Sequence, residues 1–479
     1  MSEPETGITK IHGFDDTAIR FRKFPPHAGP GTMLRRTRAF HFAFAFLLVT
    51  AEVRAQGLIN PGAGPINRAM AGASTAAPVD FGSTYWNPAN LSGLERPEFL
   101  LGSELILPSI HLTSSLAKGS IGGVFPPRNR YGVSRSDGGV GANLATGAAF
   151  KLDDSSPWTY GIGVFGLAGG NVNFAGSSAT PLLTPRNFPK TYGFGPIWAN
   201  MATLSIQPSA SIRLSDQLSV GGGPVITSSS LGFSPAFFAP GPKDALGVPT
   251  FPNGTNSRTF WGGGFQIGLL YELNKNWNLG FSYKSPIWQE RWGFNAENPN
   301  LSQRRIGIQA NLPAIYSWGI AYKGIERALI DVDLRYLDYA NTALFGQSVQ
   351  SGGVGWNSVF AVATGGQYAL TDRLTLRAGY LFNTNPIPAT ATLFNLQLPA
   401  IVTNTISFGT SYKVTDDITF SAAWVHGFRN SIEGGIGQLP GSSAKLDVQT
   451  DSIIAGLNIK FGGKSKVQKA IESDASEPL

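Results

Sequence analysis

A period-two alternation of side chains limits most strongly how this chain can fold. At 417–429, large apolar side chains oppose small or polar ones: Ile418, Phe420, Ala422, Trp424 and Phe428 against Thr419, Ser421, Ala423 and Gly427. The pattern recurs at 200–213, 277–284, 373–383 and 402–414. Because successive side chains of a β-strand point to opposite faces, this periodicity predicts strands with one apolar and one polar face.

The polar face of these strands distinguishes two kinds of β-protein. A soluble sandwich would carry many Lys and Glu side chains there, whereas this face carries Gly, Ser, Thr and Ala. Charged residues make up 14% of the chain, against roughly 25% in soluble domains. Glycine is abundant, with 59 residues, and aromatic residues reach 11%. A barrel wall between lipid and a narrow lumen accounts for this balance.

Short turns alternate with long loops along the chain. Turn-forming residues mark 152–158, 214–218, 273–277, 323–327, 370–374 and 414–418. Longer segments rich in Pro, Gly and Asn lie at 118–139, 175–199, 233–258, 295–301, 342–355, 384–401 and 430–449. Short periplasmic turns and long external loops are typical of outer-membrane barrels.

Fourteen strands are predicted between these breaks, at 98–117, 140–151, 158–174, 200–213, 217–232, 259–273, 277–294, 302–323, 327–341, 356–370, 373–383, 402–414, 417–429 and 450–461. The predicted fold is all-β, a fourteen-stranded antiparallel transmembrane β-barrel over 98–461 with both ends on the periplasmic side.

Residues 33–55 have the arrangement of a secretory signal peptide. Arg35, Arg36 and Arg38 precede an apolar run from Ala39 to Ala51, and Val53-Arg54-Ala55 fits a cleavage site. The apolar run is shorter than the roughly 20 residues that a membrane-spanning helix needs. We therefore expect residues 1–55 to be a dispensable extension plus signal peptide, with Met33 as the natural start.

The segment 56–97 does not alternate and carries few charges, which predicts a folded plug inside the barrel. It contains Arg68-Ala69-Met70-Ala71-Gly72-Ala73, Asp80, Asn87-Pro88-Ala89 and Leu91-Ser92-Gly93. These motifs, with later segments at 279–287, 312–323 and 331–339, resemble the FadL/TodX family of outer-membrane transporters for long-chain fatty acids and hydrophobic compounds. The resemblance covers residues 57–461.

This resemblance implies an N-terminal hatch that plugs the lumen and a hydrophobic ligand that leaves through the barrel wall. Asn87, Pro88 and Ala89 are then the candidate gate. The family also implies a kink in the third strand, for which Gly166, Gly169 and Gly170 are candidates, since glycine within a strand often marks a bend. The alternative is that these glycines merely reflect a glycine-rich chain.

Two departures from the family pattern stand out. The arginine-rich loop expected before the twelfth strand is absent from 383–400, which leaves the preferred substrate open. The final aromatic residue, Phe461, is followed by a charged segment, so we expect residues 462–479 to form a periplasmic tail.

Two further groups are candidate site residues. Phe233, Phe237 and Phe238 are expected to form an apolar ligand pocket among the outer loops. Asp331, Asp333 and Arg335 point to one side of the ninth strand as lumen charges, which either hold the hatch or make ordinary ion pairs inside the barrel. Other basic side chains on the polar face could meet a carboxylate: Arg213, Lys284, Arg377 and Lys413.

No catalytic residue, metal site or cofactor is expected. Beyond the signal peptide only His111 and His426 remain, without a nucleophile motif, and the chain has no cysteine. No basic cluster carries interleaved aromatics, so no nucleic-acid partner is expected.

The expected function is passive, ligand-gated uptake of long-chain fatty acids or other hydrophobic compounds across the cell outer membrane of a Gram-negative-type envelope. The alternatives are a porin-like channel for small polar solutes and a structural or adhesive barrel. Expected partners are the hydrophobic ligand (a fatty acid or aromatic hydrocarbon), outer-membrane lipid and the barrel-assembly machinery, and the expected state is a monomer.

Overall fold

The computed structural model describes residues 56–153, 155–187, 191–243, 250–254, 258–298, 300–437 and 439–462. The predicted extension and signal peptide, and the predicted C-terminal tail beyond Gly462, lie outside the described residues. Within this part of the chain, no helix has the length and apolarity needed to cross a membrane.

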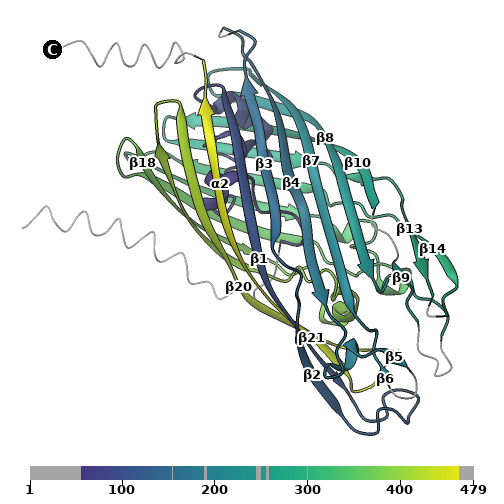
Figure 1. The fold of residues 1–479 in the computed structure, drawn as a ribbon. Helices are drawn as coiled ribbons and strands as arrows, with labels where there is room; N and C mark the ends of the chain where they lie inside the picture. Colours follow the sequence, from purple (N-terminus) through teal and green to yellow (C-terminus); the bar gives the residue numbers. More distant parts are fainter. Residues whose placement is uncertain are drawn as a thin grey trace, which may run out of the picture. The chain divides into compact units, whose positions relative to one another are not determined.

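Fourteen antiparallel strands close into a barrel (Figure 1), which confirms the predicted fold class. Closure occurs where the first strand pairs with the last, with Glu98 opposite Lys460. The wall strands are β1 (Glu98–Leu116), β3 (Gly141–Phe150), β4 (Trp158–Phe174), β7 (Ile197–Arg213), β8 (Leu218–Ser234), β10 (Arg258–Asn274), β11 (Trp277–Lys284), β15 (Ile315–Tyr322), β16 (Ala328–Leu337), β17 (Val359–Ala369), β18 (Leu374–Asn383), β19 (Asn404–Lys413), β20 (Ile418–Gly435) and β21 (Ser443–Lys460).

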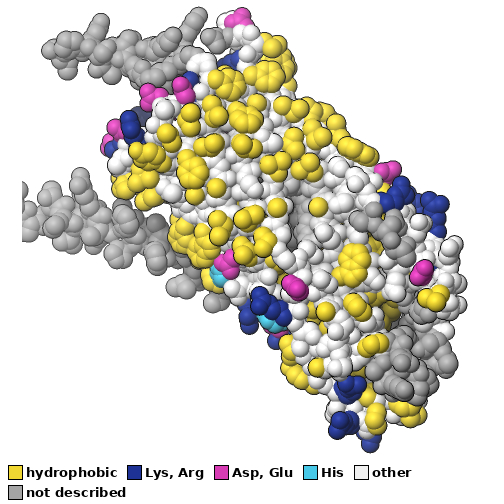
Figure 2. Space-filling model, in the orientation of Figure 1, with side chains coloured by type: hydrophobic (Ala, Val, Ile, Leu, Met, Phe, Trp, Pro, Cys, Tyr) yellow, Lys and Arg dark blue, Asp and Glu magenta, His cyan; other side chains and the backbone are white. Residues whose placement is uncertain are grey.

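The alternation seen in the sequence separates the two faces of this wall. In β20, Phe420 and Trp424 are exposed on the outside, whereas Ser421 and Ala423 are buried on the inside. Figure 2 shows hydrophobic side chains spread over the strands, where charged side chains are sparse. An apolar outer face suits contact with lipid, because the hydrocarbon region cannot solvate charge.

The chain before β1 lies inside the barrel and forms the hatch, residues 56–97. It contains α2 (Gly64–Ala69), η2 (Phe81–Tyr85) and η3 (Pro88–Gly93), and nearly all of its residues up to Leu91 are buried. Gly365 of β17 and Gly379 of β18 explain how the hatch comes so close to the wall. A Cβ atom at either position would lie 2.4 Å from the Met70 backbone, so a larger residue would push the hatch away.

Two predicted strands are wrong in their extent. Segments 277–294 and 302–323 do not run unbroken. Only β11 and β15 belong to the wall, and β12 (Trp288–Gln289) adds a short pairing with β10. The residues between form a separate sheet of β9 (Asn253–Gly254), β13 (Trp292–Glu297) and β14 (Gln303–Ile308). Pro286 and Pro313 lie at the breaks, where a residue without an N–H cannot continue the hydrogen-bond ladder.

Two predicted loops contain continuous strand segments of six residues or more. In 430–449, β20 runs on to Gly435 and β21 starts at Ser443, while in 118–139 β2 (Arg130–Arg135) pairs with β1. The sequence of this part of β20 and β21 looks like a loop because its outer face is not apolar. Glu433 and Lys445 occupy outward-facing positions there. Short remaining elements are η4 (Pro181–Leu183), β5 (Arg186–Asn187), β6 (Thr191–Tyr192), η5 (Tyr339–Asn341), η6 (Val349–Ser351) and η7 (Ala389–Asn395).

Candidate functional site

The charged residues of β16 hold the hatch. Asp331, Asp333 and Arg335 are fully buried. The Asp333 carboxylate accepts hydrogen bonds from the backbone amides of Ser74, at 3.0 Å, and Thr75, at 3.1 Å. Arg335 pairs with Asp333 and donates to the carbonyl oxygen of Gly72. A buried charge needs such partners, and Asp333 and Arg335 find theirs in the hatch, so this ion pair joins the hatch to the wall.

Arg335 also stacks on the hatch. Its guanidinium carbon lies 3.8 Å from the centroid of the Trp86 ring, a distance typical of a cation–π contact. One side chain of the wall thus meets the hatch at Gly72 and again at Trp86.

Asn87, Pro88 and Ala89 lie against β8 and β10, which are four and three strands away from β16 around the wall. The Asn87 amide nitrogen donates to the carbonyl oxygens of Thr75, at 2.8 Å, and Leu269, at 2.9 Å, while its oxygen accepts from Ala89 N at 3.0 Å. These bonds join two turns of the hatch to each other and to β10. Asn87 is therefore placed as an anchor between hatch and strand.

Three of the four basic side chains that the sequence offered as carboxylate partners are engaged with the protein itself. Lys284 Nζ donates to the carbonyl oxygen of Tyr85 at 2.9 Å, and Arg377 Nε donates to Gln367 at 3.0 Å. Arg213 lies 3.6 Å from the Glu272 carboxylate. Arg68, which the sequence offered only as part of the hatch motif, forms a buried ion pair of 2.7 Å with Glu104.

The wall is interrupted between β3 and β4. Their ladder ends with Ala145 opposite Phe165, yet β4 continues to Phe174 and pairs there with no wall strand other than β7. The β4–β7 register shifts between Gly166 and Ala168, which makes Leu167 the extra residue of a bulge. Further out, Asp137 N donates to Asn173 O at 2.7 Å. We call the unpaired stretch between these two points the window.

The first residues of the hatch lie at this window. Asn60 N donates to Leu167 O at 2.9 Å, and Asn60 Nδ2 donates to Gly166 O at 2.8 Å. Ile59 forms an antiparallel bridge with Ala168. A Cβ at Gly166 would lie 1.5 Å from Asn143 Oδ1, so a larger residue there would displace the Asn143 side chain. The three predicted kink glycines thus sit where the ladder ends and the hatch begins.

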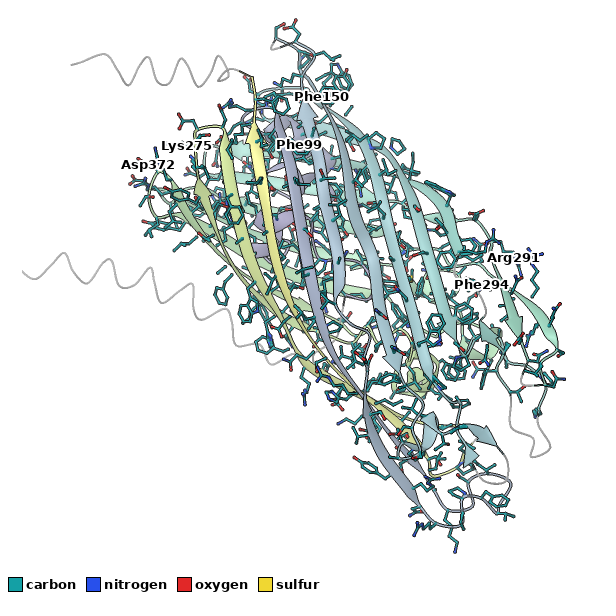
Figure 3. All side chains as sticks on the ribbon, in the orientation of Figure 1. Phe99, Phe150, Lys275, Arg291, Phe294 and Asp372 are labelled. Atoms are coloured by element: carbon teal, nitrogen blue, oxygen red, sulfur yellow. The ribbon has the colours of Figure 1, made fainter. Side chains whose placement is uncertain are left out.

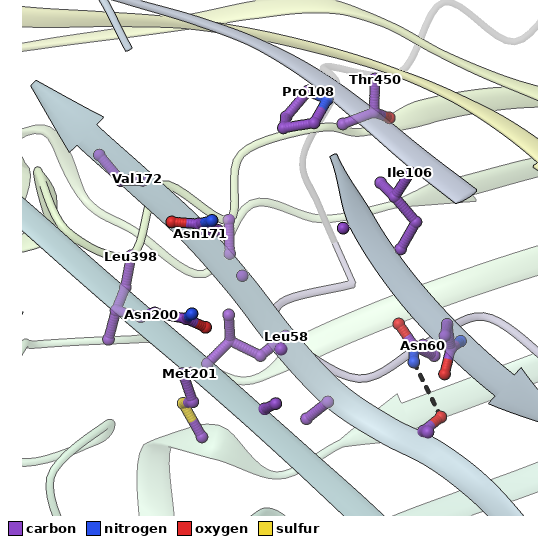
Figure 4. Close-up of a pocket in the computed structure, with 18 of the residues that line it drawn as sticks. Leu58, Asn60, Ile106, Pro108, Asn171, Val172, Asn200, Met201, Leu398 and Thr450 are labelled. Atoms are coloured by element: carbon purple, nitrogen blue, oxygen red, sulfur yellow. Dashed lines mark hydrogen bonds between the residues drawn. The ribbon is translucent and has the colours of Figure 1, made fainter. Parts of the chain in front are cut away.

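A cavity of about 540 Å³ occupies the window (Figure 4). Its size is within the roughly 300–1,000 Å³ of small-molecule pockets. Apolar side chains dominate the lining, with several amides and no charged residue; they include Leu58, Ile106, Val172, Met201, Leu398, Asn60, Asn171, Asn200 and Gln397. Gly166, Gly169 and Gly170 also line it, whereas Asn87, Pro88 and Ala89 do not.

The three predicted pocket phenylalanines pack against other aromatic rings and do not line this cavity. Phe233 and Phe238 lie 4.9 Å apart between ring centroids, and Phe237 lies 5.1 Å from Phe194. Phe233 and Phe237 are almost fully buried. Phe233 and Phe238 thus belong to one group of packed aromatic rings and Phe237 to another. Sequence reasoning missed Gly57–Asn60 and the 397–402 segment, which carry no chemical motif and become neighbours only in the folded chain.

Catalytic and metal-binding arrangements are not evident in the part of the chain that the structure describes. No group of three or more His, Asp or Glu side chains there could hold a metal ion. His426 pairs with Asp451 at 2.8 Å on the outer wall.

Comparison with known proteins agrees with this architecture. Residues 47–462 match the family model described as "Outer membrane protein transport protein (OMPP1/FadL/TodX)". The long-chain fatty acid transport protein of Escherichia coli O6:H1 is 24% identical over 416 residues, which cover 78% of this chain and 86% of that protein. The 47 kDa outer membrane protein of Pasteurella multocida is 22% identical, covering 88% of this chain and 96% of that protein.

Solved structures share the fold. A Pseudomonas aeruginosa FadL homologue superposes with a TM-score of 0.64 at 16% identity, covering 85% of this chain and 100% of that chain. The toluene transporter TodX of P. putida gives 0.61 at 17% identity, covering 84% and 99%. Since the family model spans most of the sequence and the barrel agrees, this chain is an outer-membrane protein that belongs to the OMPP1/FadL/TodX family of outer membrane transport proteins.

Proposed function

We propose that this protein takes up hydrophobic molecules and releases them sideways into the membrane through the window between β3 and β4. The observation that carries the proposal is the uncharged cavity at the interruption of the wall. Moving apolar surface into water costs about 25 cal/mol per Å². A lateral exit into lipid avoids that cost, whereas a water-filled pore would impose it.

The ligand class is supported by the lining and by relatives. A cavity without charged residues suits an uncharged compound, or the hydrocarbon chain of a fatty acid whose carboxylate stays outside. The E. coli relative is named a long-chain fatty acid transport protein, and TodX a toluene transporter. We therefore propose long-chain fatty acids or other hydrophobic compounds, such as aromatic hydrocarbons, as the substrate class.

The proposed gate is the hatch edge at Gly57–Asn60. These residues line the cavity and are bound to the bulge by hydrogen bonds, so a ligand that enters must compete with those contacts. Asp333, Arg335 and Asn87 keep the remainder of the hatch in place. We propose that Asn87, Pro88 and Ala89 act as the anchor of the hatch and that gating movement is confined to its first residues.

The porin-like alternative finds less support, because the hatch fills the lumen with buried contacts to β10 and β16. The proposal includes no catalytic step, in keeping with a family of transport proteins. We further propose that the protein acts as a monomer in contact with outer-membrane lipid, after insertion by the barrel-assembly machinery.

The test is uptake of labelled oleate and labelled toluene by cells that lack their own transporter. Gly170→Phe would fill the window, since Gly170 lines the cavity and a Cβ there meets nothing within 4 Å. Gly437→Phe is the matched control, because a Cβ there also meets open space but the residue does not line the cavity.

We expect the parent and Gly437→Phe to take up at least one of the two compounds, and Gly170→Phe to lower that uptake on the order of tenfold, as the loss of about 1.4 kcal/mol would. Unchanged uptake in Gly170→Phe would exclude the window as the route. Leakage of a small sugar through the parent protein, without oleate or toluene uptake, would favour a porin.

A further inference from the structure

Three arginines lie on one face of the small sheet outside the barrel mouth. In β13 and β14, Trp292, Phe294 and Ile306 are buried, and Trp292 stacks on Phe260 of β10 with ring centroids 5.0 Å apart. The opposite face of the hairpin carries Arg291 and Arg305, and Arg258 of β10 reaches the same face. We call Arg258, Arg291 and Arg305 the arginine face. Figure 2 shows Lys and Arg side chains gathered over this hairpin, and Figure 3 labels Arg291 there.

The three guanidinium groups converge on a bare patch of backbone. Gly293 and Gly307 are register partners in the hairpin. A Cβ at Gly293 would lie 3.8 Å from Arg258 Nη1 and 3.8 Å from Arg305 Nη2, and a Cβ at Gly307 would lie 2.7 Å from Arg291 Nε. Because both glycines lack a side chain, the backbone between the three positively charged guanidinium groups is uncovered, and we call it the floor of the site.

No described carboxylate forms an ion pair with these arginines, although Glu297 lies on the same face of β13. Among the residues that the structure describes, no ion pair involves Arg258, Arg291 or Arg305. Glu290, next to Arg291 in the sequence, accepts a hydrogen bond from Trp261 N at 2.8 Å. Arg258 and Arg291 donate to the backbone carbonyls of Gly293 and Gly307 at 3.4 Å each. A guanidinium has five N–H donors, so most remain available to an anion.

The position of the face relative to the membrane suggests the source of that anion. Trp261 and Trp288 project from the outer wall with exposures of 55% and 53%, as expected for an aromatic belt at the membrane interface. Arg258 precedes Trp261 by three residues and Arg291 follows Trp288 by three. At about 3.3 Å per residue, Arg258 lies roughly 10 Å along β10 beyond Trp261, which places the arginine face on the head-group side of the belt.

We propose that the arginine face binds the phosphate of a phosphorylated lipid head group in the outer leaflet. Guanidinium groups bind phosphate through paired, charge-assisted hydrogen bonds, and several around one floor can bind one phosphate together. None of the three arginines lines the cavity at the window. This lipid site is therefore separate from the proposed transport route.

The test uses the full-length protein, purified in detergent and delipidated, with binding measured by native mass spectrometry. The probes are lipid A with both phosphates, dephosphorylated lipid A, and inorganic phosphate. The site variant is Arg258→Gln/Arg291→Gln/Arg305→Gln. The control is Lys275→Gln/Lys323→Gln/Arg373→Gln, which removes the same charge at the opposite end of the barrel, where Figure 3 labels Lys275.

We expect lipid A to bind the parent and the control with similar affinity, and the site variant about tenfold more weakly or worse, as the loss of a charge-assisted pair implies. Dephosphorylated lipid A should not bind at this site. Equal binding of lipid A by the parent and the site variant would overturn the proposal. Binding of inorganic phosphate as tight as that of lipid A would also overturn it, since the face would then be a site for free anions.

A second variant retains all three arginines. Gly293→Glu places a carboxylate beside Arg258 and Arg305, where it would neutralise them internally. We expect the same loss of lipid A binding, with the folded barrel verified by its heat-dependent electrophoretic mobility. Full binding by Gly293→Glu in a folded barrel would contradict the site at this position.

Discussion

The backbone amide of Asn60 in the hatch donates a hydrogen bond of 2.9 Å to the carbonyl oxygen of Leu167 in the wall strand β4. Leu167 is the bulged residue and has no register partner in β7. The hatch thus supplies a hydrogen-bond donor at the point where the strand pairing of the wall is irregular. Because buried carbonyl groups need a donor, displacement of the hatch edge would cost the Leu167 carbonyl this hydrogen bond.

A disulfide between Ile59→Cys and Ala168→Cys should lock this contact. The two residues form an antiparallel bridge, for which Cα atoms lie about 4.5–5.5 Å apart, within the range that disulfides span. The natural chain has no cysteine. We expect oxidation to lower oleate or toluene uptake on the order of tenfold, with recovery after reduction.

The matched control for that lock is Leu376→Cys with Thr410→Cys, which joins two register partners in β18 and β19 away from the window. It should transport normally in both redox states. Full uptake by the oxidised 59–168 pair would show that the hatch edge need not move.

Asp333→Ala should loosen the hatch strongly. The substitution removes the acceptor of Ser74 N and Thr75 N and leaves the Arg335 guanidinium buried beside no carboxylate except that of Asp331. Breaking one partner of a buried ion pair costs about 3–5 kcal/mol. Hydrogen exchange of the Ser74 and Thr75 amides, with the denaturation midpoint of the barrel, measures the effect.

Asp372→Ala is the comparison for Asp333→Ala, because the Asp372 side chain is 94% exposed and pairs with Arg327 at the surface. Such pairs contribute about 0–1 kcal/mol. Similar losses in both variants would contradict a fastening role for Asp333.

Asn87→Asp should weaken the anchor without changing its shape. It replaces the amide nitrogen that donates to Thr75 O and Leu269 O with an oxygen that repels both carbonyl oxygens. The loss of these hydrogen bonds should destabilise the hatch by about 1–3 kcal/mol. We expect a higher baseline conductance for small ions in planar bilayers, since the hatch would fit the lumen less tightly. Asn129→Asp is the control, because that exposed side chain accepts from Lys118 N and an aspartate keeps the acceptor.

The fit of the hatch should depend on pH through Asp80, which lies in the hatch outside the strands. Burial raises the pKa of Asp80 from 3.8 to about 6, against the opposing effects of Asn458 and Arg377. A raised pKa means that the folded hatch favours the protonated acid. The stabilisation of the folded hatch by protonated Asp80 is complete below about pH 4 and is lost as the pH rises through 6. Bilayer conductance should therefore rise between pH 4 and 6.5.

Asp80→Asn should remove that slope and keep the low conductance throughout. If the slope persists, another carboxyl group is responsible, and the nearest candidate is Glu98, which accepts a hydrogen bond from Phe81 N.

Much of the barrel could be predicted from the sequence because alternation is a local property of a strand. Thr419 to Phe428 already separate into two faces within one segment, and turn residues mark where each strand reverses. The errors at 277–294 and 302–323 arose where an apolar pattern continues past Pro286 and Pro313 into a hairpin outside the wall. There, side chains bury against aromatic rings of the barrel mouth instead of lipid, and the sequence pattern is the same.

The candidate site was less predictable. Asp333 and Arg335 could be assigned to one face of a strand, yet Asp333 binds Ser74, a residue 259 positions away. Gly166 could be suspected of bending β4, but the window also needs β3 to begin at Gly141 and the hatch edge to meet Leu167. Such contacts depend on how a long chain closes, and no short pattern records them.

The sequence by itself determined a fourteen-stranded outer-membrane barrel with a plug at its amino-terminal end, since strand faces, turn chemistry and composition are read residue by residue. The tertiary structure decided which hatch residues lie at the wall opening and which anchor the hatch. It also brought Arg258, Arg291 and Arg305 together from two strands and a connecting segment. The physical reason is that close packing inside a closed barrel joins residues by shape and hydrogen bonding across long separations, where spacing along the chain carries no signal.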